Sequence, residues 1–514
     1  MPKHSIHAGT AAAALVCLAA FGLTPGSAAA AAAQPSPAAP SRFVPGPCPK
    51  PPEPIEALSN ARCGFLEVPE NRSRPGSRTI KLAVAVVPAV SAKPAADPVV
   101  FMAGGPGGDT YDDLPFVVDS GLNKDRELII MAQRGNLYDQ PSLTCPEVDR
   151  FNERSVGLGY DAQPAEQGFL KAVTDCRARL VADGADLGAY NSTENAADFA
   201  DLRKALNIPL WNVYGYSYGS DLALTYMRLY PEGIRAVAID SITPPQTVNL
   251  PWTWASTSEG IRNIFEACAA QPACKDRYPD LPQLLTDQVR RLEAQPLTLN
   301  VTPPDGGKPV KTVLDGGALL NLIVAFNPRP KDIPAALEEL GNGNPERFAQ
   351  ARAAGSVPKK ISHSSHGLTN SIACAEWAPG YSEPDVLAAG RKAYPEWPDS
   401  VLAQPPQLPF QYPACGIWNV PDRAKIQRVA TVSSLPALVI SGTFDVKTAV
   451  SYAQGVIKNL SNSTAIQVPG IGHWVVPQSP CAQRVLASFL ARPTAPDTGC
   501  VDDLEPEPFT IIPK

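Results

Sequence analysis

A serine held between two glycines constrains this chain more than any other feature. Residues 215–219 read Gly-Tyr-Ser-Tyr-Gly, a G-x-S-x-G pattern centred on Ser217. An apolar, β-prone run at 210–214 precedes the pattern, and apolar residues at helical spacing follow it from 220 to 230. A strand that turns sharply into a helix needs residues without a Cβ at the turn. The sequence therefore predicts a strand, a tight turn and a helix, with the Ser217 hydroxyl exposed at the turn.

A serine hydroxyl is a weak nucleophile without a base, and the chain has only five histidines to supply one. Two of them lie within the first ten residues, and His363 and His366 occupy a Ser-rich stretch. Only His473 follows a strand-like run, at 463–468. We therefore predict that His473 accepts the Ser217 proton and later returns it to the leaving group.

A base of this kind needs an acid that fixes its tautomer. Asp445 follows the apolar run 437–442, which ends at a glycine, so the chain order is Ser, acid, His. Asp240, at the end of the run 234–239, is the rival, although a helix N-cap or a structural hydrogen bond explains it equally well. We predict Asp445 as the acid that orients His473 and keep Asp240 as the alternative.

His363 and His366 are spaced so that both could face one metal ion on a helix. Their flanks are rich in serine, and the neighbouring sequence offers no carboxylate or thiolate partner. These features favour a solvated loop, so we expect neither a metal nor another cofactor.

A Gly-rich run follows the buried-strand pattern at 98–102. Residues 103–108 read Ala-Gly-Gly-Pro-Gly-Gly. Glycines there allow a backbone N–H to point at a developing oxyanion, and we predict the N–H of Gly105 and the N–H of Tyr218 as the two donors. A phosphate-binding loop is the alternative, but no Lys-Ser/Thr pair follows these glycines.

Together these motifs resemble the secreted tripeptidyl aminopeptidase-like branch of the α/β-hydrolases, which is related to proline iminopeptidases. The resemblance covers nearly the whole mature chain. It rests on the Gly-rich run, the G-x-S-x-G pattern, Gln133-Arg134-Gly135, the pattern G-x-x-D-x-x-T at 442–448, and Gly472-His473 with paired late cysteines.

The resemblance implies a cofactor-free serine hydrolase that removes short peptides or single residues from free N-termini. An acyl-enzyme on Ser217 would be the intermediate. A carboxylesterase acting on small or lipid-like acyl esters is the alternative, because both activities use this intermediate and differ in the pocket and the leaving group. A catalytically silent binding protein on the same fold has no need of Ser217, Asp445 and His473 together.

Strand-like runs alternate with helical patterns, which predicts an α/β-hydrolase fold with a mostly parallel central sheet. The runs lie at 80–87, 98–102, 127–131, 210–214, 234–239, 437–442 and 463–468. We divide the expected hydrolase core into 55–242 and 434–514, the second part with a helix at 447–460. A large, mainly helical cap is expected at 243–433, with helices at 258–270 and 281–294.

The chain begins with a predicted secretory signal peptide, residues 1–33, cleaved near Ala30 to Ala33. Its apolar core is too short for a stable membrane anchor, so we expect soluble export. Residues 34–54 are rich in Pro and Ala and are predicted to be a linker outside the fold. The net charge of −6, without basic runs, gives no reason to expect a nucleic-acid partner, which leaves a peptide or ester substrate.

Removal of the leader would leave ten cysteines, an even number that is typical of an exported, oxidised protein. Sequence does not fix their connectivity. They fall into neighbouring pairs, Cys48 with Cys63, Cys145 with Cys176, Cys268 with Cys274, Cys374 with Cys415, and Cys481 with Cys500.

Substrate contacts are expected from the cap. An exopeptidase must recognise a free α-amino group, and Glu376 is a candidate carboxylate, with Trp377 as a pocket wall; surface solvation is the alternative for Glu376. Trp252 and Trp254 could line a pocket or fill the cap core. Arg134 is interpreted mainly as a brace of the turn beside the site, with a substrate carboxylate contact as the alternative.

Overall fold

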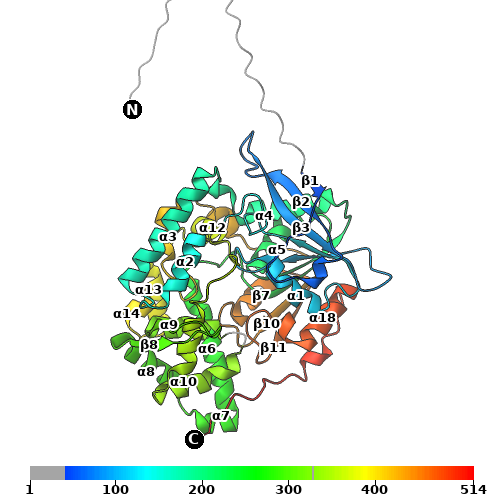
Figure 1. The fold of residues 1–514 in the computed structure, drawn as a ribbon. Helices are drawn as coiled ribbons and strands as arrows, with labels where there is room; N and C mark the ends of the chain where they lie inside the picture. Colours follow the sequence, from blue (N-terminus) through cyan, green and yellow to red (C-terminus); the bar gives the residue numbers. More distant parts are fainter. Residues whose placement is uncertain (1–40, 327–328, 514) are drawn as a thin grey trace, which may run out of the picture.

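The computed structural model describes residues 41–326 and 329–513. The predicted signal peptide, and residues 34–40 of the predicted linker, lie outside the described residues. Within them, one sheet runs in the order β1-β2-β3-β5-β4-β6-β7-β10-β11 (Figure 1). The strands are β1 Arg42–Pro45, β2 Arg62–Pro69, β3 Thr79–Val87, β4 Val99–Met102, β5 Leu128–Met131, β6 Trp211–Ser217, β7 Ile234–Ile242, β10 Ala437–Gly442 and β11 Ser463–Val468.

The sheet is mostly parallel, as expected. Neighbouring strands from β5 to β11 pair in parallel, whereas β1, β2 and β3 pair antiparallel at one edge. The prediction that 34–54 lies wholly outside the fold is wrong, because β1 pairs with β2 over four residues. A Pro-rich composition is compatible with an edge strand, where unpaired backbone groups face solvent.

Helices cover both faces of the sheet. Apolar side chains of α4 (Ser192–Ala205), α5 (Tyr218–Leu229) and α17 (Val450–Ile457) pack with one face. Those of α1 (Thr110–Asp119) and α18 (Pro480–Ala491) pack with the other. The strands β4, β5 and β10 are buried along their whole length, which explains why they appear in the sequence as largely apolar runs.

The segment between β7 and β10 is mainly helical, as its sequence predicts, and also contains the hairpin β8–β9, which the sequence analysis did not predict. We call residues 243–433 the inserted segment. Its elements are α6 Trp252–Ala270, α7 Pro272–Arg277, α8 Leu281–Ala294, β8 Leu297–Val301, β9 Val310–Leu314, α9 Gly316–Ala325, α10 Ile333–Gly341, α11 Glu346–Ala354, α12 His366–Ile372, the π-helix η4 Ala373–Trp377, α13 Glu383–Ala393, α14 Asp399–Leu402, α15 Gln411–Trp418 and α16 Ala424–Gln427.

Two further helices belong spatially to the inserted segment although they precede it in the chain. They are α2 (Pro146–Ser155) and α3 (Gln163–Ala182), between β5 and β6. In Figure 1 they stand on the same side of the sheet as α9, α13 and α14, and α3 contacts α15. The helical layer beside the sheet is therefore built from two separate stretches of sequence.

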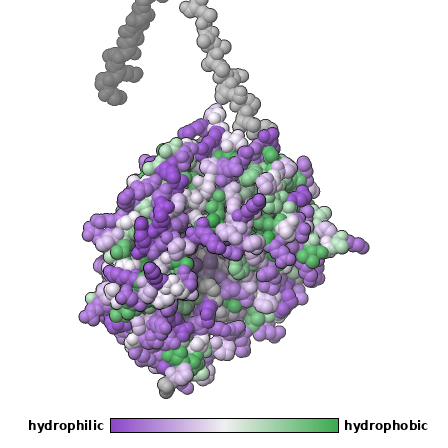
Figure 2. Space-filling view, in the orientation of Figure 1, coloured by the Kyte–Doolittle hydropathy of each residue, from purple (hydrophilic) through white to green (hydrophobic). Residues whose placement is uncertain are grey.

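The face of the molecule in Figure 2 mixes hydrophilic and hydrophobic side chains and is hollowed near its centre. Among the described residues, no helix has the length and apolar character needed to cross a membrane.

Candidate active site

The turn after β6 has the geometry that its sequence predicts. Ser217 is the last residue of β6 and precedes α5, with φ 54°. A positive φ is costly for a residue other than glycine and is typical of a functional turn. A Cβ at Gly219 would overlap the Met102 carbonyl oxygen, and one at Gly215 would overlap the Gly219 carbonyl oxygen. Both glycines are therefore required by close packing, and Ser217 itself is only half-buried.

Asp445 and His473 are brought together at the carboxyl ends of β10 and β11. Asp445 Oδ2 lies 2.8 Å from His473 Nδ1. The same carboxylate accepts hydrogen bonds from the N–H of Lys447 at 2.8 Å and from the N–H and hydroxyl of Thr448 at 2.9 and 2.6 Å. Burial alone would raise the pKa of Asp445, but His473 and the Thr448 hydrogen bonds hold the pKa below its ordinary value. An ionised Asp445 can therefore orient His473.

Asp240 is fully buried and has other partners. It accepts hydrogen bonds from the N–H groups of Val475 and Val476 at 3.0 and 2.9 Å and from the Tyr214 hydroxyl at 3.1 Å. It therefore fixes the loop that follows His473, which agrees with the structural interpretation of Asp240. Burial raises the pKa of its carboxyl despite these bonds.

The Gly-rich loop, residues 104–109, lies against the serine turn. A Cβ at Gly104 would come within 3.1 Å of the Ser217 Cβ. Gly105 is exposed and has φ 120°, a backbone conformation that favours glycine. The Gln133 side chain holds the loop by donating to the carbonyl oxygens of Ala103 at 2.8 Å and Gly104 at 3.1 Å.

In the part of the chain that the structure describes, no hydrogen bond joins the Ser217 hydroxyl to the His473 ring. The ring does lie beside the turn, with its centroid 6.3 Å from that of Tyr216. Catalytic hydrogen bonds often tighten only when substrate binds. The pairing of nucleophile and base, and the donor roles of Gly105 and Tyr218, stay predictions.

His363 and His366 do not form a pair; His363 lies in a partly exposed loop, as predicted, whereas His366 is the first residue of α12. His363 Nδ1 contacts Asp112 of α1, whereas His366 Nε2 lies 3.2 Å from Asp149 of α2. Their carboxylate partners lie more than 200 residues away in sequence, beyond what a local pattern can reveal.

Arg134 is a structural brace, so its alternative role in substrate binding is wrong. Its side chain is fully buried and pairs with Asp198 through two hydrogen bonds of 2.8 Å. It also donates to the carbonyl oxygens of Glu70 and Ala189. No face of the guanidinium is left for a ligand.

Glu376 lies beside Ser192 and is 1% exposed, so it is not a solvated surface residue. Its two oxygens accept from the N–H and the hydroxyl of Ser192, at 2.7 and 2.6 Å. The Ser192 hydroxyl also lies 2.9 Å from the Tyr218 hydroxyl, and Trp377 packs edge-on against the Tyr218 ring. Burial raises the pKa of Glu376 to about 7 although Ser192 opposes this. Its role toward substrate stays a prediction.

One face of α6 lines a cavity of about 1080 Å³ together with α8 and α13. Trp252 lines this cavity and stacks on Tyr452, with ring centroids 4.1 Å apart, whereas Trp254 is fully buried in the helical core. Trp252 therefore lines a pocket, whereas Trp254 fills the core of the inserted segment.

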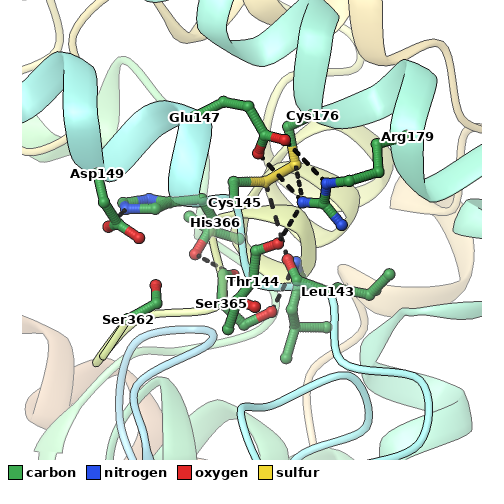
Figure 3. Close-up of a disulfide and its surroundings, with 12 residues drawn as sticks. Leu143, Thr144, Cys145, Glu147, Asp149, Cys176, Arg179, Ser362, Ser365 and His366 are labelled. Atoms are coloured by element: carbon green, nitrogen blue, oxygen red, sulfur yellow. Dashed lines mark hydrogen bonds and ion pairs between the residues drawn. A yellow bond between two sulfur atoms is a disulfide. The ribbon is translucent and has the colours of Figure 1, made fainter. Parts of the chain in front are cut away.

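All five neighbouring cysteine pairs form disulfides, which confirms the expected pairing. Figure 3 shows Cys145–Cys176 beside Glu147 and Arg179. Glu147 and the two sulfur atoms lie close enough to suggest a metal site, but both thiols are consumed in the disulfide. Five disulfides are typical of a protein outside the cytosol.

Comparison with known proteins agrees with this architecture. The family of the α/β-hydrolase fold matches residues 97–293, and the TAP-like protein family matches residues 406–502. The chain is 24% identical to the serine protease Hip1 of Mycobacterium tuberculosis, over 87% of this chain and 88% of that protein. It is 27% identical to carboxylesterase B of the same species, over 42% and 43%. A crystal structure of proline iminopeptidase from Mycobacterium smegmatis is 16% identical, with a TM-score of 0.37 over 84% of this chain and 98% of that one.

The chain therefore has the α/β-hydrolase fold, which confirms the predicted fold class. Its similarity to the TAP-like proteins, to the serine protease Hip1 and to carboxylesterase B confirms the resemblance seen in the sequence.

Several supporting residues escaped the sequence analysis. The sequence gives Thr448 no role beyond its place in the motif, although an Asp side chain commonly accepts from the backbone N–H two residues later, as Asp445 does from Lys447. The motif that contains Gln133 likewise does not reveal that this side chain holds the Gly-rich loop. Ser192 gave no local signal, because its partners Glu376 and Tyr218 come from distant segments.

Proposed function

We propose that this protein is a secreted aminopeptidase that releases short peptides, of the tripeptidyl type, or single residues from free N-termini. The observation that carries the proposal is the Asp445–His473 hydrogen bond beside the strained Ser217 turn. The match to a serine protease over most of both chains and the TAP-like match at 406–502 favour peptides as substrates. The five disulfides support export.

The chemistry begins with attack of Ser217 Oγ on the scissile carbonyl carbon. A proton on His473 Nδ1, shared with Asp445, leaves Nε2 free to accept the Ser217 proton. His473 then gives this proton to the leaving amine as the C–N bond breaks, which forms the acyl-enzyme. A water molecule, deprotonated by His473, attacks the ester and frees Ser217.

Both tetrahedral intermediates carry a negative oxygen that needs donors fixed in advance. Tyr218 is the first residue of α5, so its N–H is not needed by the helix, and the exposed Gly105 lies in the loop beside Ser217. We assign these two N–H groups to the oxyanion, where each well-placed donor typically contributes about 10²-fold or more in kcat.

Recognition of a free α-amino group distinguishes this proposal from an esterase. Glu376 remains the first carboxylate to test, although an incoming ammonium would have to share it with Ser192. Trp377, packed on Tyr218, would wall the same region. The similarity to carboxylesterase B keeps ester hydrolysis as the second candidate function.

A fluorophosphonate probe tests the nucleophile. It should label the wild-type protein and the control variant Ser120→Ala, which loses only a surface hydroxyl at the end of α1. It should leave Ser217→Ala unlabelled, and the kcat of that variant should fall by about 10⁴-fold or more without unfolding. Equal labelling of Ser217→Ala would reject the assignment.

Paired substrates test the choice between peptidase and esterase. A peptide with a free N-terminus should react at least about a hundredfold faster than its acetylated twin, because acetylation removes the charge that a buried carboxylate would pair with. Glu376→Gln should lose this discrimination, whereas the exposed control Glu396→Gln should keep it. Equal rates on both peptides, with faster turnover of simple esters, would favour the esterase.

A further inference from the structure

A short stretch of the inserted segment lies directly on the Gly-rich loop. We call residues 362–369 the strap. Its backbone pairs with the loop through an isolated bridge between Ser364 and Gly108, and the N–H of Ser365 donates to the Gly107 carbonyl oxygen at 2.7 Å. The N–H of Asp109 donates back to the His363 carbonyl oxygen at 3.2 Å. The strap therefore follows the loop residue by residue.

One side chain of the strap also bonds the loop. The Thr369 hydroxyl donates to the Pro106 carbonyl oxygen at 2.7 Å, immediately after Gly105. A Cβ at Gly107 would lie 2.6 Å from the Ser365 carbonyl oxygen and 3.0 Å from the Thr369 hydroxyl oxygen. The two backbones approach so closely that a side chain at Gly107 would force them apart.

The strap is itself anchored on both sides. His363 contacts Asp112 on α1, and His366 lies 3.2 Å from Asp149 on α2, as Figure 3 shows for the second pair. Ser365 Oγ donates to the Gly135 carbonyl oxygen at 2.8 Å, and the N–H of Gly367 donates to Leu143, beside the disulfide Cys145–Cys176. These contacts tie the strap to the core independently of the Gly-rich loop.

We propose that the strap sets the position of the oxyanion-binding loop and that Thr369 is a positioning residue for the reaction. From the core side, Gln133 donates to Ala103 and Gly104 and accepts from the N–H of Gly107 at 3.1 Å, and Asn136 donates to the Gly108 carbonyl oxygen at 2.7 Å. The carbonyl oxygens of Pro106 and Gly107, in contrast, accept from the strap. A shift of the loop moves the Gly105 N–H relative to Ser217, and a displacement of about 1 Å can cost about 10²-fold in rate. The inference rests on the proposed function.

Thr369→Val tests the proposal, since it removes the hydroxyl and keeps the shape. We expect kcat to fall about tenfold to a hundredfold with KM nearly unchanged. Affinity for a trifluoromethyl ketone, which forms an oxyanion on the serine, should fall by the same factor. Thr369→Ser should restore most of the activity. The control Thr431→Val loses an equivalent hydroxyl bond, 2.8 Å to the Leu224 carbonyl oxygen, and should leave both readouts unchanged.

Wild-type kcat in Thr369→Val, or a loss confined to KM, or a Ser variant as slow as the Val variant, would overturn the strap's role. If Thr369→Val does not fold, Gly107→Ala serves instead and should show the same loss in kcat. The proposed function fails in a different way, because the wild-type protein itself would then show no preference for peptides with a free N-terminus, whereas failure of the strap's role leaves the activity of the wild-type protein as proposed.

Discussion

Asp445 and Glu376 are buried carboxylates at the candidate active site, and their pKa values are displaced in opposite directions. Both are about 1% exposed, so depth does not distinguish them. Asp445 faces His473 and accepts from Thr448, and these partners outweigh burial and lower its pKa. Within residues 41–326 and 329–513, Glu376 accepts hydrogen bonds from Ser192 alone, and burial prevails, which raises its pKa to about 7.

The difference teaches that the partners of a buried acid, and not its depth, decide its charge. Asp445 is kept ionised, as an acid that orients a catalytic histidine must be. Glu376 titrates near neutral pH, so its pairing with a substrate amine would depend on pH. Their settings differ too, since α6 packs on the loop of Asp445, whereas Glu376 lies in a π-helix beside Tyr218.

The largest expected effect separates Asp445 from Asp240. Asp445→Asn should lower kcat by about 10⁴-fold, because an amide leaves His473 in the wrong tautomer. Asp240→Asn should cost far less in kcat and act mainly on stability, since its partners are the N–H groups of Val475 and Val476. Steady-state kinetics and thermal unfolding of both variants measure this, and the reverse ranking would move the acid to Asp240.

The opposite pKa shifts predict opposite effects of pH on stability. Because the Glu376 pKa rises from 4.5 to about 7 on folding, the folded state binds more protons between these values, and its contribution to stability falls as pH rises through this window, by about 3 kcal/mol. For Asp445, whose pKa is lowered from 3.8, the contribution is present above pH 3.8 and is lost as pH falls through its folded pKa.

Urea unfolding at pH 5 and pH 8 measures the first of these effects. Glu376→Gln should remove the share of Glu376 from the loss of stability that the wild-type protein shows between the two pH values, and Glu396→Gln on the surface should leave that loss unchanged. A loss should persist in Glu376→Gln, because burial also raises the pKa values of Asp109 and Asp113, to about 7 and about 8. An identical pH dependence in wild type and Glu376→Gln would show that Glu376 does not titrate there.

A third prediction concerns the packing of α6 on the loop that contains Asp445. Gly260 of α6 approaches the acid loop so closely that a Cβ would lie 2.6 Å from Val446 Cα and would overlap the Asp445 carbonyl oxygen. Gly260→Ala should cost about 1–3 kcal/mol in unfolding free energy and lower kcat by displacing Asp445. The control is Gly455→Ala on α17, where a Cβ meets open space, so no loss should follow.

The smallest effect is expected at the anchors of the strap. Asp149→Asn weakens the contact with His366, a partly exposed pair that should contribute less than about 1 kcal/mol and be screened by salt. Thermal unfolding at low and high salt measures it, with Asp175→Asn, which breaks the exposed pair with Lys171, as the control. A loss of kcat as large as that of Asp445→Asn would contradict the modest role given to this anchor.

The sequence predicts best where one local cause decides the structure. The strands at 437–442 and 463–468 have the predicted bounds. For 437–442 the cause is burial, because a buried parallel strand appears as a largely apolar run, here ending at a glycine. The helix expected at 447–460 is shorter, Val450–Ile457, and follows the turn in which the N–H groups of Lys447 and Thr448 donate to Asp445. β2 was not predicted, because it lies near an edge of the sheet and its apolar residues are interrupted by Gly64 and Glu67.

The residues of the candidate site likewise fall into those that local sequence predicts and those that depend on distant contacts. Ser217, Asp445 and His473 were predictable because each follows a strand at the edge where parallel strands end together. The partners of His363, Glu376 and the strap were not, because tertiary contacts between distant segments supply them. A Ser-rich stretch has no periodicity to reveal that it lies against a Gly-rich loop.

The contacts of α6 limit how the protein can be re-engineered. Thr257 and Asn263 donate to the carbonyl oxygens of Val446 and Thr443, and Ser256 accepts from the N–H of Ala449. Replacing the whole inserted segment would leave these backbone groups, in the loop that contains Asp445, without their partners. Each group that stays buried and unpaired would lower the free energy of unfolding. Chimaeras designed to change specificity should therefore retain α6 from the parent and exchange only the elements beyond it.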